Sequence, residues 1–290
     1  MRSIEYGGKL AGIAIALVYL CFFQDQPVFE WVLIGVILIT VGIPHGSLDH
    51  LLQNPKISNK NLVKFIGKYL TIILVYLAVW LLVPFPALLA FLGMSAYHFG
   101  QSHFLRTPIW HLKKTTYLLT GTFYLSIIFW GDFAATTEIL SGIFDASPLA
   151  GFGWYLIIGS FVSAAVLIVR NLPNKWWPHL AEMILMGYLF YQLPLLLGFI
   201  LYFGFWHALP SMQVEYSALK QHLGSQQLKA FVGKMIPFTG ASILGMAAIL
   251  FVLYPRSSTE ELILLFFVLV SLISAPHIWY MNHFLESREA

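Results

Sequence analysis

Histidines inside long apolar segments are the residues of this sequence whose type and spacing could do chemistry. Four short motifs hold most of them, at residues 42–50 (GIPHGSLDH), 97–103 (YHFGQSH), 205–211 (FWHALPS) and 275–283 (APHIWYMNH). An ionisable side chain at membrane depth needs a partner, a metal or a wet cavity, because a charge is costly in hydrocarbon. Neutral imidazole nitrogens bind iron, copper or zinc well, so His45, His98, His207 and His277 could together form a metal site.

Other polar groups in the motifs could support such a site. Asp49 follows His45 by four residues, on the same face of a helix, where its carboxylate could orient a ligand imidazole or hold a bound water. His50 and His103 each follow a candidate ligand by five residues and are rotated about 140° from it, so they are expected near the metal rather than on it. Met281 could line the adjoining pocket.

The composition predicts that these motifs lie in a membrane. The 290 residues are 59% hydrophobic and only 10% charged, and the mean hydropathy of +0.77 is far above that of a water-soluble domain. Long apolar runs recur from end to end, which predicts one transmembrane domain over residues 1–290. The single cysteine, Cys21, excludes an intramolecular disulfide and a cysteine-ligated cluster.

The fold predicted by these runs is an all-α bundle of about ten transmembrane helices. Eight or nine spans remain open, because the seventh is short and contains Glu182. If the N-terminus is cytoplasmic, every Lys and Arg except Arg256 falls on the cytoplasmic side, together with the C-terminus. The spans are expected at residues 9–23, 29–52, 62–83, 86–105, 114–131, 152–170, 177–192, 194–213, 236–254 and 261–283.

The four motifs all lie on even-numbered spans, which would run from outside to inside. Counting from the outer end of each span places the four histidines within roughly 6 Å of one another in depth. We therefore expect one layer of imidazoles in the cytoplasmic half of the membrane. Residues 131–151 would form an outer loop, and residues 215–234 a short amphipathic helix on the cytoplasmic surface.

Two other functions fit histidines in a membrane. The four could bind two haems as axial pairs in an electron-transfer protein. Alternatively, Asp49, Glu182 and the histidines could form the relay of a proton-coupled transporter. A lone histidine in a membrane helix more often makes a hydrogen bond between helices, and this is the role expected of His111, His179 and His222.

At the four motifs the sequence resembles the Brp/Blh family of carotene-cleaving oxygenases. The most specific parts are the Pro-His-Gly box that ends at Asp49 and the box formed by His98, Phe99 and Gly100. The resemblance implies a multi-pass protein of the cell inner membrane that uses Fe(2+). It implies a beta-carotene 15,15'-dioxygenase, which cleaves beta-carotene with O2 at the central double bond to give two all-trans-retinal.

The resemblance also implies the roles of single residues. Carried over by the motifs, His45, His98 and His207 would be iron ligands. Ser211 stands where many members carry a second histidine, so His277 is chosen as the fourth ligand. His103 stands where an acidic residue is expected and is the alternative.

The implied substrate sets the expected surroundings. Carotene dissolves in the hydrocarbon layer, so its enzyme needs an apolar tunnel open to lipid. The expected partners are beta-carotene, O2 and the lipid bilayer, with retinal passing to a microbial rhodopsin and no nucleic acid involved.

Overall fold

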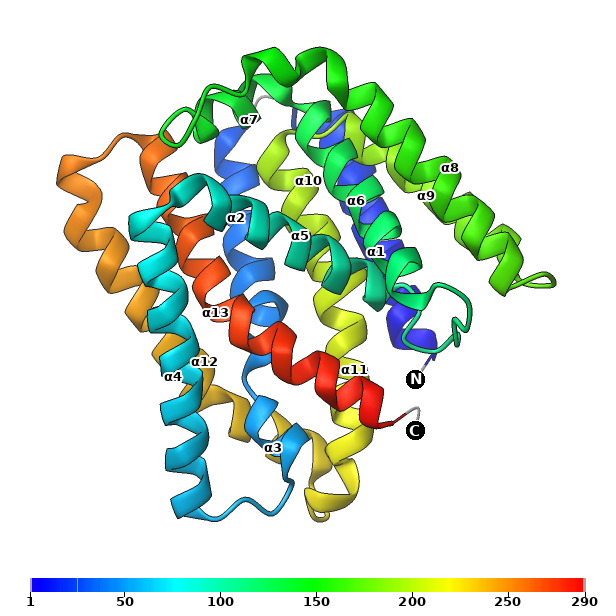
Figure 1. The fold of residues 1–290 in the computed structure, drawn as a ribbon. Helices are drawn as coiled ribbons and strands as arrows, with labels where there is room; N and C mark the ends of the chain where they lie inside the picture. The colour runs from blue at the N-terminus through cyan, green and yellow to red at the C-terminus, as the bar shows by residue number, and fades with distance from the viewer. Residues whose placement is uncertain (1, 25, 289–290) are drawn as a thin grey trace. The chain divides into compact units, whose positions relative to one another are not determined.

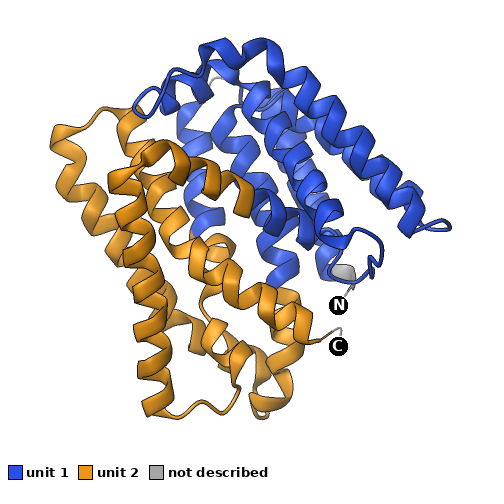
Figure 2. Cartoon of the chain, in the orientation of Figure 1, with its two compact units in different colours: residues 1–38, 95–211 blue, residues 39–94, 212–290 orange. Residues whose placement is uncertain are grey.

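The regular elements of the chain are helices. The computed structural model describes residues 2–24 and 26–288, and every regular element in these ranges is helical (Figure 1). The all-α class predicted from the apolar runs is therefore confirmed. The chain divides into two compact units, residues 1–38 with 95–211 and residues 39–94 with 212–290 (Figure 2).

Unit 1 is built around α6, which packs against α8, α9 and α10, while α10 also packs against α2. Its elements are α1 (Arg2–Phe22), α2 (Pro27–Ile37), the second half of α5 (Pro84–Ser102), α6 (Lys113–Gly131), α7 (Phe133–Leu140), η3 (Ser147–Phe152), α8 (Gly153–Asn171), α9 (Trp176–Tyr191), α10 (Leu195–Leu201), η4 (Tyr202–Ala208) and the start of α11 (Leu209–Leu219).

Unit 2 is built around α13, which packs against α3, α4 and α12. Its elements are most of η1 (Leu38–Gly42), η2 (Pro44–Gly46), α3 (Asp49–Gln53), α4 (Asn59–Leu82), the first half of α5, most of α11, η5 (Lys220–His222), α12 (Gln227–Leu253), η6 (Tyr254–Arg256) and α13 (Thr259–Ser287).

Seven helices of the described residues are long and apolar enough to cross a membrane, and α6 with α7, bent by 93°, would make an eighth. Each of the ten expected spans coincides with a helical segment, although α5 and α9 are not among the seven. The α9 helix has only 16 residues, fewer than the roughly 20 that a membrane crossing usually needs.

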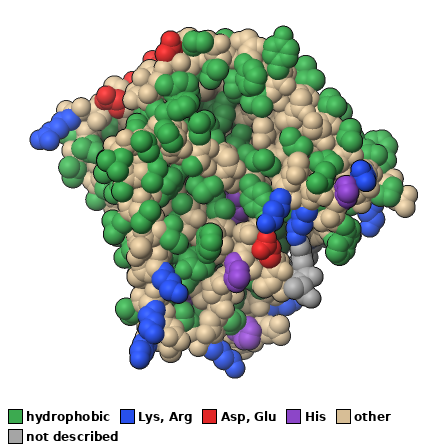
Figure 3. All heavy atoms as spheres, in the orientation of Figure 1, with side chains coloured by type: hydrophobic (Ala, Val, Ile, Leu, Met, Phe, Trp, Pro, Cys, Tyr) green, Lys and Arg blue, Asp and Glu red, His purple; other side chains and the backbone are tan. Residues whose placement is uncertain are grey.

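The outward faces of these helices are suited to lipid. On α8, Trp154, Ile158 and Val162 are exposed, whereas Ile157 and Ala164 face the interior. Figure 3 shows hydrophobic side chains spread over the face of the molecule that it displays. Because the outward residues are apolar, each such helix can contact hydrocarbon while its own backbone hydrogen bonds stay satisfied.

Two glycines allow α5 and α6 to meet backbone to backbone within unit 1. A Cβ at Gly100 would lie 1.8 Å from the carbonyl oxygen of Tyr117, and one at Gly121 would lie 1.7 Å from that of Ala96. No side chain fits at either position. Small residues at helix contacts let membrane helices approach closely and gain packing energy. The glycine of the motif at residues 97–103 therefore serves packing.

The segment at residues 215–234 corrects one expectation. Instead of a separate surface helix, α11 continues to Leu219 and α12 begins at Gln227. Glu215 is fully buried on α11, with 0% of its surface exposed. The prediction was wrong because the polar residues of this segment were read as one solvated face, whereas they belong to the ends of two helices.

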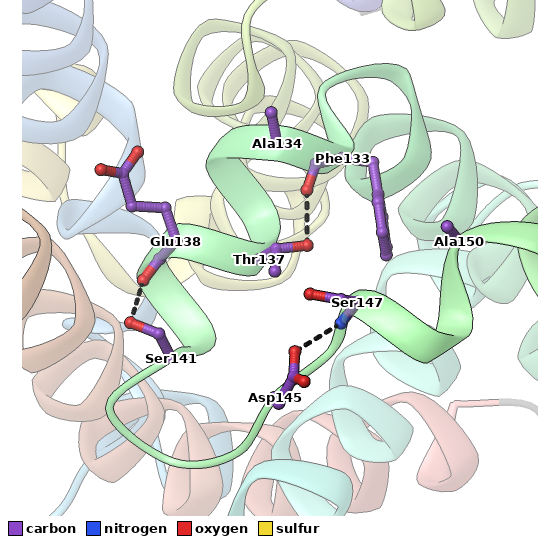
Figure 4. Close-up of a pocket in the computed structure, with 8 residues that line it drawn as sticks. All are labelled: Phe133, Ala134, Thr137, Glu138, Ser141, Asp145, Ser147 and Ala150. Carbon is purple, nitrogen blue, oxygen red and sulfur yellow. Dashed lines mark hydrogen bonds between the residues drawn. The ribbon is translucent and has the colours of Figure 1, made fainter.

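The expected outer loop at residues 131–151 is folded into α7, a turn and the start of η3. It forms an open surface pocket lined by Phe133, Ala134, Thr137, Glu138, Ser141, Asp145, Ser147 and Ala150 (Figure 4). Hydrogen bonds from the Ser147 side chain and backbone to the Asp145 carboxylate lower the pKa of Asp145. The polar groups of the pocket thus brace the loop itself.

The glycine contact predicts a sharp packing defect. We expect Gly121→Ala to destabilise the folded chain by roughly 1–3 kcal/mol, because the added methyl group collides with the Ala96 carbonyl and helices must separate. Thermal unfolding in detergent micelles measures the effect. The matched control is Gly159→Ala on α8, where nothing lies within 4 Å of the new Cβ and stability should hold or rise. Equal unfolding temperatures for Gly121→Ala and the unmodified chain would contradict the account.

Candidate metal centre

Unit 2 brings together His45 and His277. His45 lies in η2, directly after the π-helix η1, and His277 follows Pro276 on α13. Their rings meet edge to face with centroids 4.7 Å apart and an interplanar angle of 85°. The Nδ1 of His45 is hydrogen-bonded to the Gly42 carbonyl oxygen. A carbonyl can only accept, so Nδ1 carries the proton and Nε2 is left in the form that binds metal.

Asp49 fixes His277 in the same way. Its carboxylate oxygens lie 3.0 and 3.1 Å from Nδ1 of His277, and Asp49 is 2% exposed. Nδ1–H of His277 donates to the carboxylate, so Nε2 is again the ligand atom. The expectation that Asp49 could orient an imidazole fits this contact, but the imidazole comes from the last helix instead of the same one.

Gly46 explains why glycine follows His45 in the Pro-His-Gly box. A Cβ at residue 46 would lie 3.1 Å from Nδ1 of His277, closer than ordinary packing distance. Any side chain there would push the His277 ring away from Asp49. The box therefore supplies one candidate ligand and the space for a second.

Unit 1 brings together His98 on α5 and His207 in the π-helix η4. The ring centroids are 4.6 Å apart, with the rings tilted by 70°. Ser102 Oγ lies 2.7 Å from Nδ1 of His207 and donates to the carbonyl oxygen of His98 at 3.2 Å. Because the hydroxyl has only one proton, it must accept from His207, whose Nε2 is then the ligand atom.

The two pairs share the properties of metal ligands. His45, His98, His207 and His277 are 7%, 2%, 1% and 3% exposed, and each offers an imidazole nitrogen that could bind a metal ion. In three of the four, an oxygen acceptor holds the Nδ1 proton, which is the usual outer support of a ligand histidine. A set of neutral imidazoles suits iron, copper or zinc and fits the cofactor expected from the motifs.

Both π-helices lie beside candidate ligands, since η1 ends three residues before His45 and η4 contains His207. A π-turn inserts an extra residue into a helix and is frequently found at functional sites. Pro44 and Pro210 each follow one of these segments. The prolines marked the places where the regular backbone breaks, without indicating the form of the break.

The matched-depth prediction assumed that the spans run parallel. In unit 1, His98 contacts His207 while His103, five residues later, contacts Tyr202, five residues earlier. Parallel spans would bring such residues together in the same order, so α5 and η4 do not run parallel. That assumption does not hold for α5, and the common depth of the four histidines stays a prediction.

The remaining predicted residues are buried near these pairs or in other contacts. His50 on α3 lies against Phe238, with ring centroids 4.6 Å apart. His103 contacts Tyr202 and lies near Glu182. Ser211 and Met281 are 1% and 0% exposed.

Sequence reasoning missed two residues. Ser102 follows His98 by four residues and so lies on its helix face, which is a usable signal, although its imidazole partner is on another helix. Glu215 is a second buried acid of unit 2, and it interacts electrostatically with Asp49 of the same unit. Nothing local in the sequence separated it from a solvated residue.

Comparisons with known proteins agree with the motifs. A family model described as "Beta-carotene 15,15'-dioxygenase" matches residues 36–285. The chain is 25% identical over 260 residues to a beta-carotene 15,15'-dioxygenase of uncultured marine bacterium 66A03, covering 86% of this chain and 91% of that protein.

A second relative is the probable beta-carotene 15,15'-dioxygenase Blh of Halobacterium salinarum. It is 23% identical over 287 residues, covering 83% of this chain and 80% of the relative. No solved structure matches the chain significantly. The resemblance read from the histidine motifs is confirmed by these matches.

The Ser102 contact gives a test of ligand orientation. If the site holds the iron that the motifs imply, we expect Ser102→Ala to weaken its binding by roughly 10–100-fold, because His207 loses the acceptor that fixes its tautomer and ring angle. Iron retained after dialysis against graded chelator measures the change. Ser160→Ala is the control, since that hydroxyl bonds only carbonyls of its own helix, at Leu156 and Ile157. Unchanged iron retention in Ser102→Ala would remove Ser102 from the site.

Proposed function

We propose that this chain, which belongs to the beta-carotene 15,15'-dioxygenase family, cleaves beta-carotene with O2 at the central 15,15' double bond and releases two all-trans-retinal. The observation that carries the proposal is the pair of buried imidazoles in each unit, with Nδ1 protons held by Gly42, Asp49 and Ser102. All four histidines lie inside the region that the family model matches.

We infer that His45, His98, His207 and His277 hold one iron(II) ion. Four neutral ligands would leave the charge of the metal uncompensated. Bound iron(II) would supply the activation of O2 that oxidative cleavage of a double bond requires. Asp49 contributes by holding His277 in place through the hydrogen bond to Nδ1. Ser211, in this assignment, is a neighbour of the ligands.

The side chains around the histidines suit an apolar substrate. Phe99 and Phe203 lie against the His207 ring, with centroids 4.5 and 5.6 Å away. Such walls exclude water, which protects a reactive centre from side reactions. Beta-carotene would enter from the hydrocarbon layer, and retinal would leave into it, where a microbial rhodopsin could take it up.

The ring geometry disfavours the haem alternative. Two histidines that shared one haem would have to lie on opposite faces of the macrocycle. Within each pair the rings instead meet edge to face at 4.6 and 4.7 Å between centroids, which leaves no room for a porphyrin between them. We therefore propose a mononuclear centre.

We further propose that the chain crosses the cell inner membrane ten times, with both termini in the cytoplasm. The support is the helix found at each expected span and the basic residues that this topology collects on one side. The oblique α5 and the short α9 would then complete the ten crossings, and the exposed side chains of α9, such as Ile184 and Tyr188, are apolar or aromatic and suit lipid.

Reporter fusions test the topology. A periplasm-dependent phosphatase inserted after Asp145 should be active, and one fused after the last residue should be inactive, because only the first lies outside. A cytoplasm-dependent fluorescent protein at the same two positions should give the reverse pattern. Phosphatase activity at the C-terminus would mean an odd number of crossings or an outward N-terminus.

The activity is tested by expressing the chain in bacteria that make beta-carotene and measuring retinal by chromatography. We expect retinal from the unmodified chain and a loss of at least a hundredfold in His45→Ala, His98→Ala, His207→Ala and His277→Ala, since each removes an iron ligand. His222→Ala, at an exposed position on η5, and His179→Ala are the controls and should remain active. Full activity of His277→Ala would exclude it as a ligand and turn attention to His103.

A further inference from the structure

A series of polar contacts between side chains extends through unit 1 and ends near the His98–His207 pair. Lys9 Nζ on α1 lies 2.9 and 3.0 Å from the two carboxylate oxygens of Glu182 on α9. Glu182 Oε1 lies 3.4 Å from Nδ1 of His103, directly after α5, and Nε2 of His103 lies 3.2 Å from the Tyr202 hydroxyl in η4. Three helical elements, α1, α9 and η4, and the turn after α5 are thereby joined through side chains alone.

This series of contacts fixes the orientation of the His103 ring and the nitrogen that carries its proton. Because a carboxylate only accepts hydrogen bonds, Glu182 favours the proton on Nδ1, and Nε2 then accepts from the Tyr202 hydroxyl. The imidazole is also stacked on Tyr124, with centroids 4.6 Å apart and planes 3° from parallel. His103 is therefore held in its plane and at both nitrogens.

Burial makes these contacts interdependent. Tyr202 is 0% exposed, and the side chains of His103, Lys9 and Glu182 are 5%, 15% and 26% exposed. A charge at membrane depth is tolerated when it is paired, and removal of one partner leaves the other uncompensated. Glu5 extends the set, 3.7 Å from Lys9 and 3.4 Å from Arg106.

The last residue in this series of contacts, Tyr202, lies on η4, the element that also carries the candidate ligand His207. Tyr202 is the first residue of η4, and His207 lies five residues later. A π-helix bonds each amide to the carbonyl five residues earlier, so the two residues are neighbours across one turn. On the other side, His103 lies five residues after His98. The contact between His103 and Tyr202 thus fixes the same two segments whose imidazoles meet at His98 and His207.

We propose that His103 is a positioning residue for the His98–His207 pair, held by Glu182 and Lys9 and acting through the Tyr202 hydroxyl on η4. This inference rests on the proposed function, because it assigns the pair to a metal. It gives a role to the histidine found where relatives are expected to carry an acid. It also makes α1, which lies ahead of the region matched by the family model, part of the support of the site.

The test uses Tyr202→Phe, which removes one oxygen and keeps the ring packing. We expect its iron(II) affinity, measured by competition with a chromophoric chelator, to fall by roughly 10–100-fold, as for the loss of other groups that orient ligand histidines. The unfolding temperature of the iron-free chain should stay close to that of the unmodified chain. Iron affinity unchanged from the unmodified chain would overturn the proposal.

A matched control separates positioning from general stability. Tyr19 is another buried tyrosine, and its hydroxyl donates to the Glu30 carboxylate at 2.6 Å, between α1 and α2. The variant Tyr19→Phe removes this hydrogen bond. This variant should bind iron normally. If Tyr19→Phe loses as much affinity as Tyr202→Phe, the tyrosine contacts act only through the fold, and the proposal fails.

Two further variants test the pathway through His103. The variant His103→Phe loses the contacts to both Glu182 and Tyr202. The double variant with Tyr202→Phe should have an iron affinity no lower than that of the single variant that binds iron more weakly. His103→Gln can still pair with the Tyr202 hydroxyl and should recover most of the affinity. Additive losses in the double variant would show that the two residues act separately. If the unmodified chain binds no iron, the proposed function itself fails. This outcome can be told apart from failure of the positioning role alone, in which the unmodified chain binds iron and Tyr202→Phe binds it equally well.

Discussion

The cost of placing imidazoles at membrane depth governs this structure. Hydrocarbon offers no water to satisfy a ring nitrogen, so every buried histidine needs an acceptor for its proton and a use for its lone pair. Three of the four candidate ligands obtain the acceptor from different sources: His45 from the Gly42 carbonyl, His277 from the Asp49 carboxylate and His207 from the Ser102 hydroxyl. In each case the acceptor takes Nδ1, so the lone pair on Nε2 is the one that can bind metal.

The backbone is adapted to this requirement where the ligands lie. The π-helices η1 and η4 change the direction in which nearby side chains leave the helix, at η2 and His207 respectively. Gly46 leaves room for the His277 ring, and Gly100 with Gly121 lets α5, which carries His98, approach α6. The glycines and prolines of the motifs are thus explained by space and backbone geometry, and the histidines by chemistry.

Much of this could be predicted from the sequence because it depends on local signals. Apolar runs gave the helices, and buried imidazoles beside proline and glycine gave the candidate ligands. Other features depend on the tertiary fold. Asp49 orients an imidazole from α13, Ser102 one from η4, and Glu215 is buried at a helix end that reads as a solvated segment. The direction of α5 could not be found either, because a span's tilt leaves no pattern in its own residues.

The central claim is that two histidine pairs, one in each unit, bind a single iron ion. It is tested most directly by iron analysis and X-ray absorption of the purified chain, alongside His45→Ala and His98→Ala. The account predicts one iron per chain with about four nitrogen neighbours near 2 Å, and loss of that iron in both variants. If His98→Ala keeps its iron with the same coordination as the unmodified chain, then the pair in unit 1 is not part of the centre and the account is wrong.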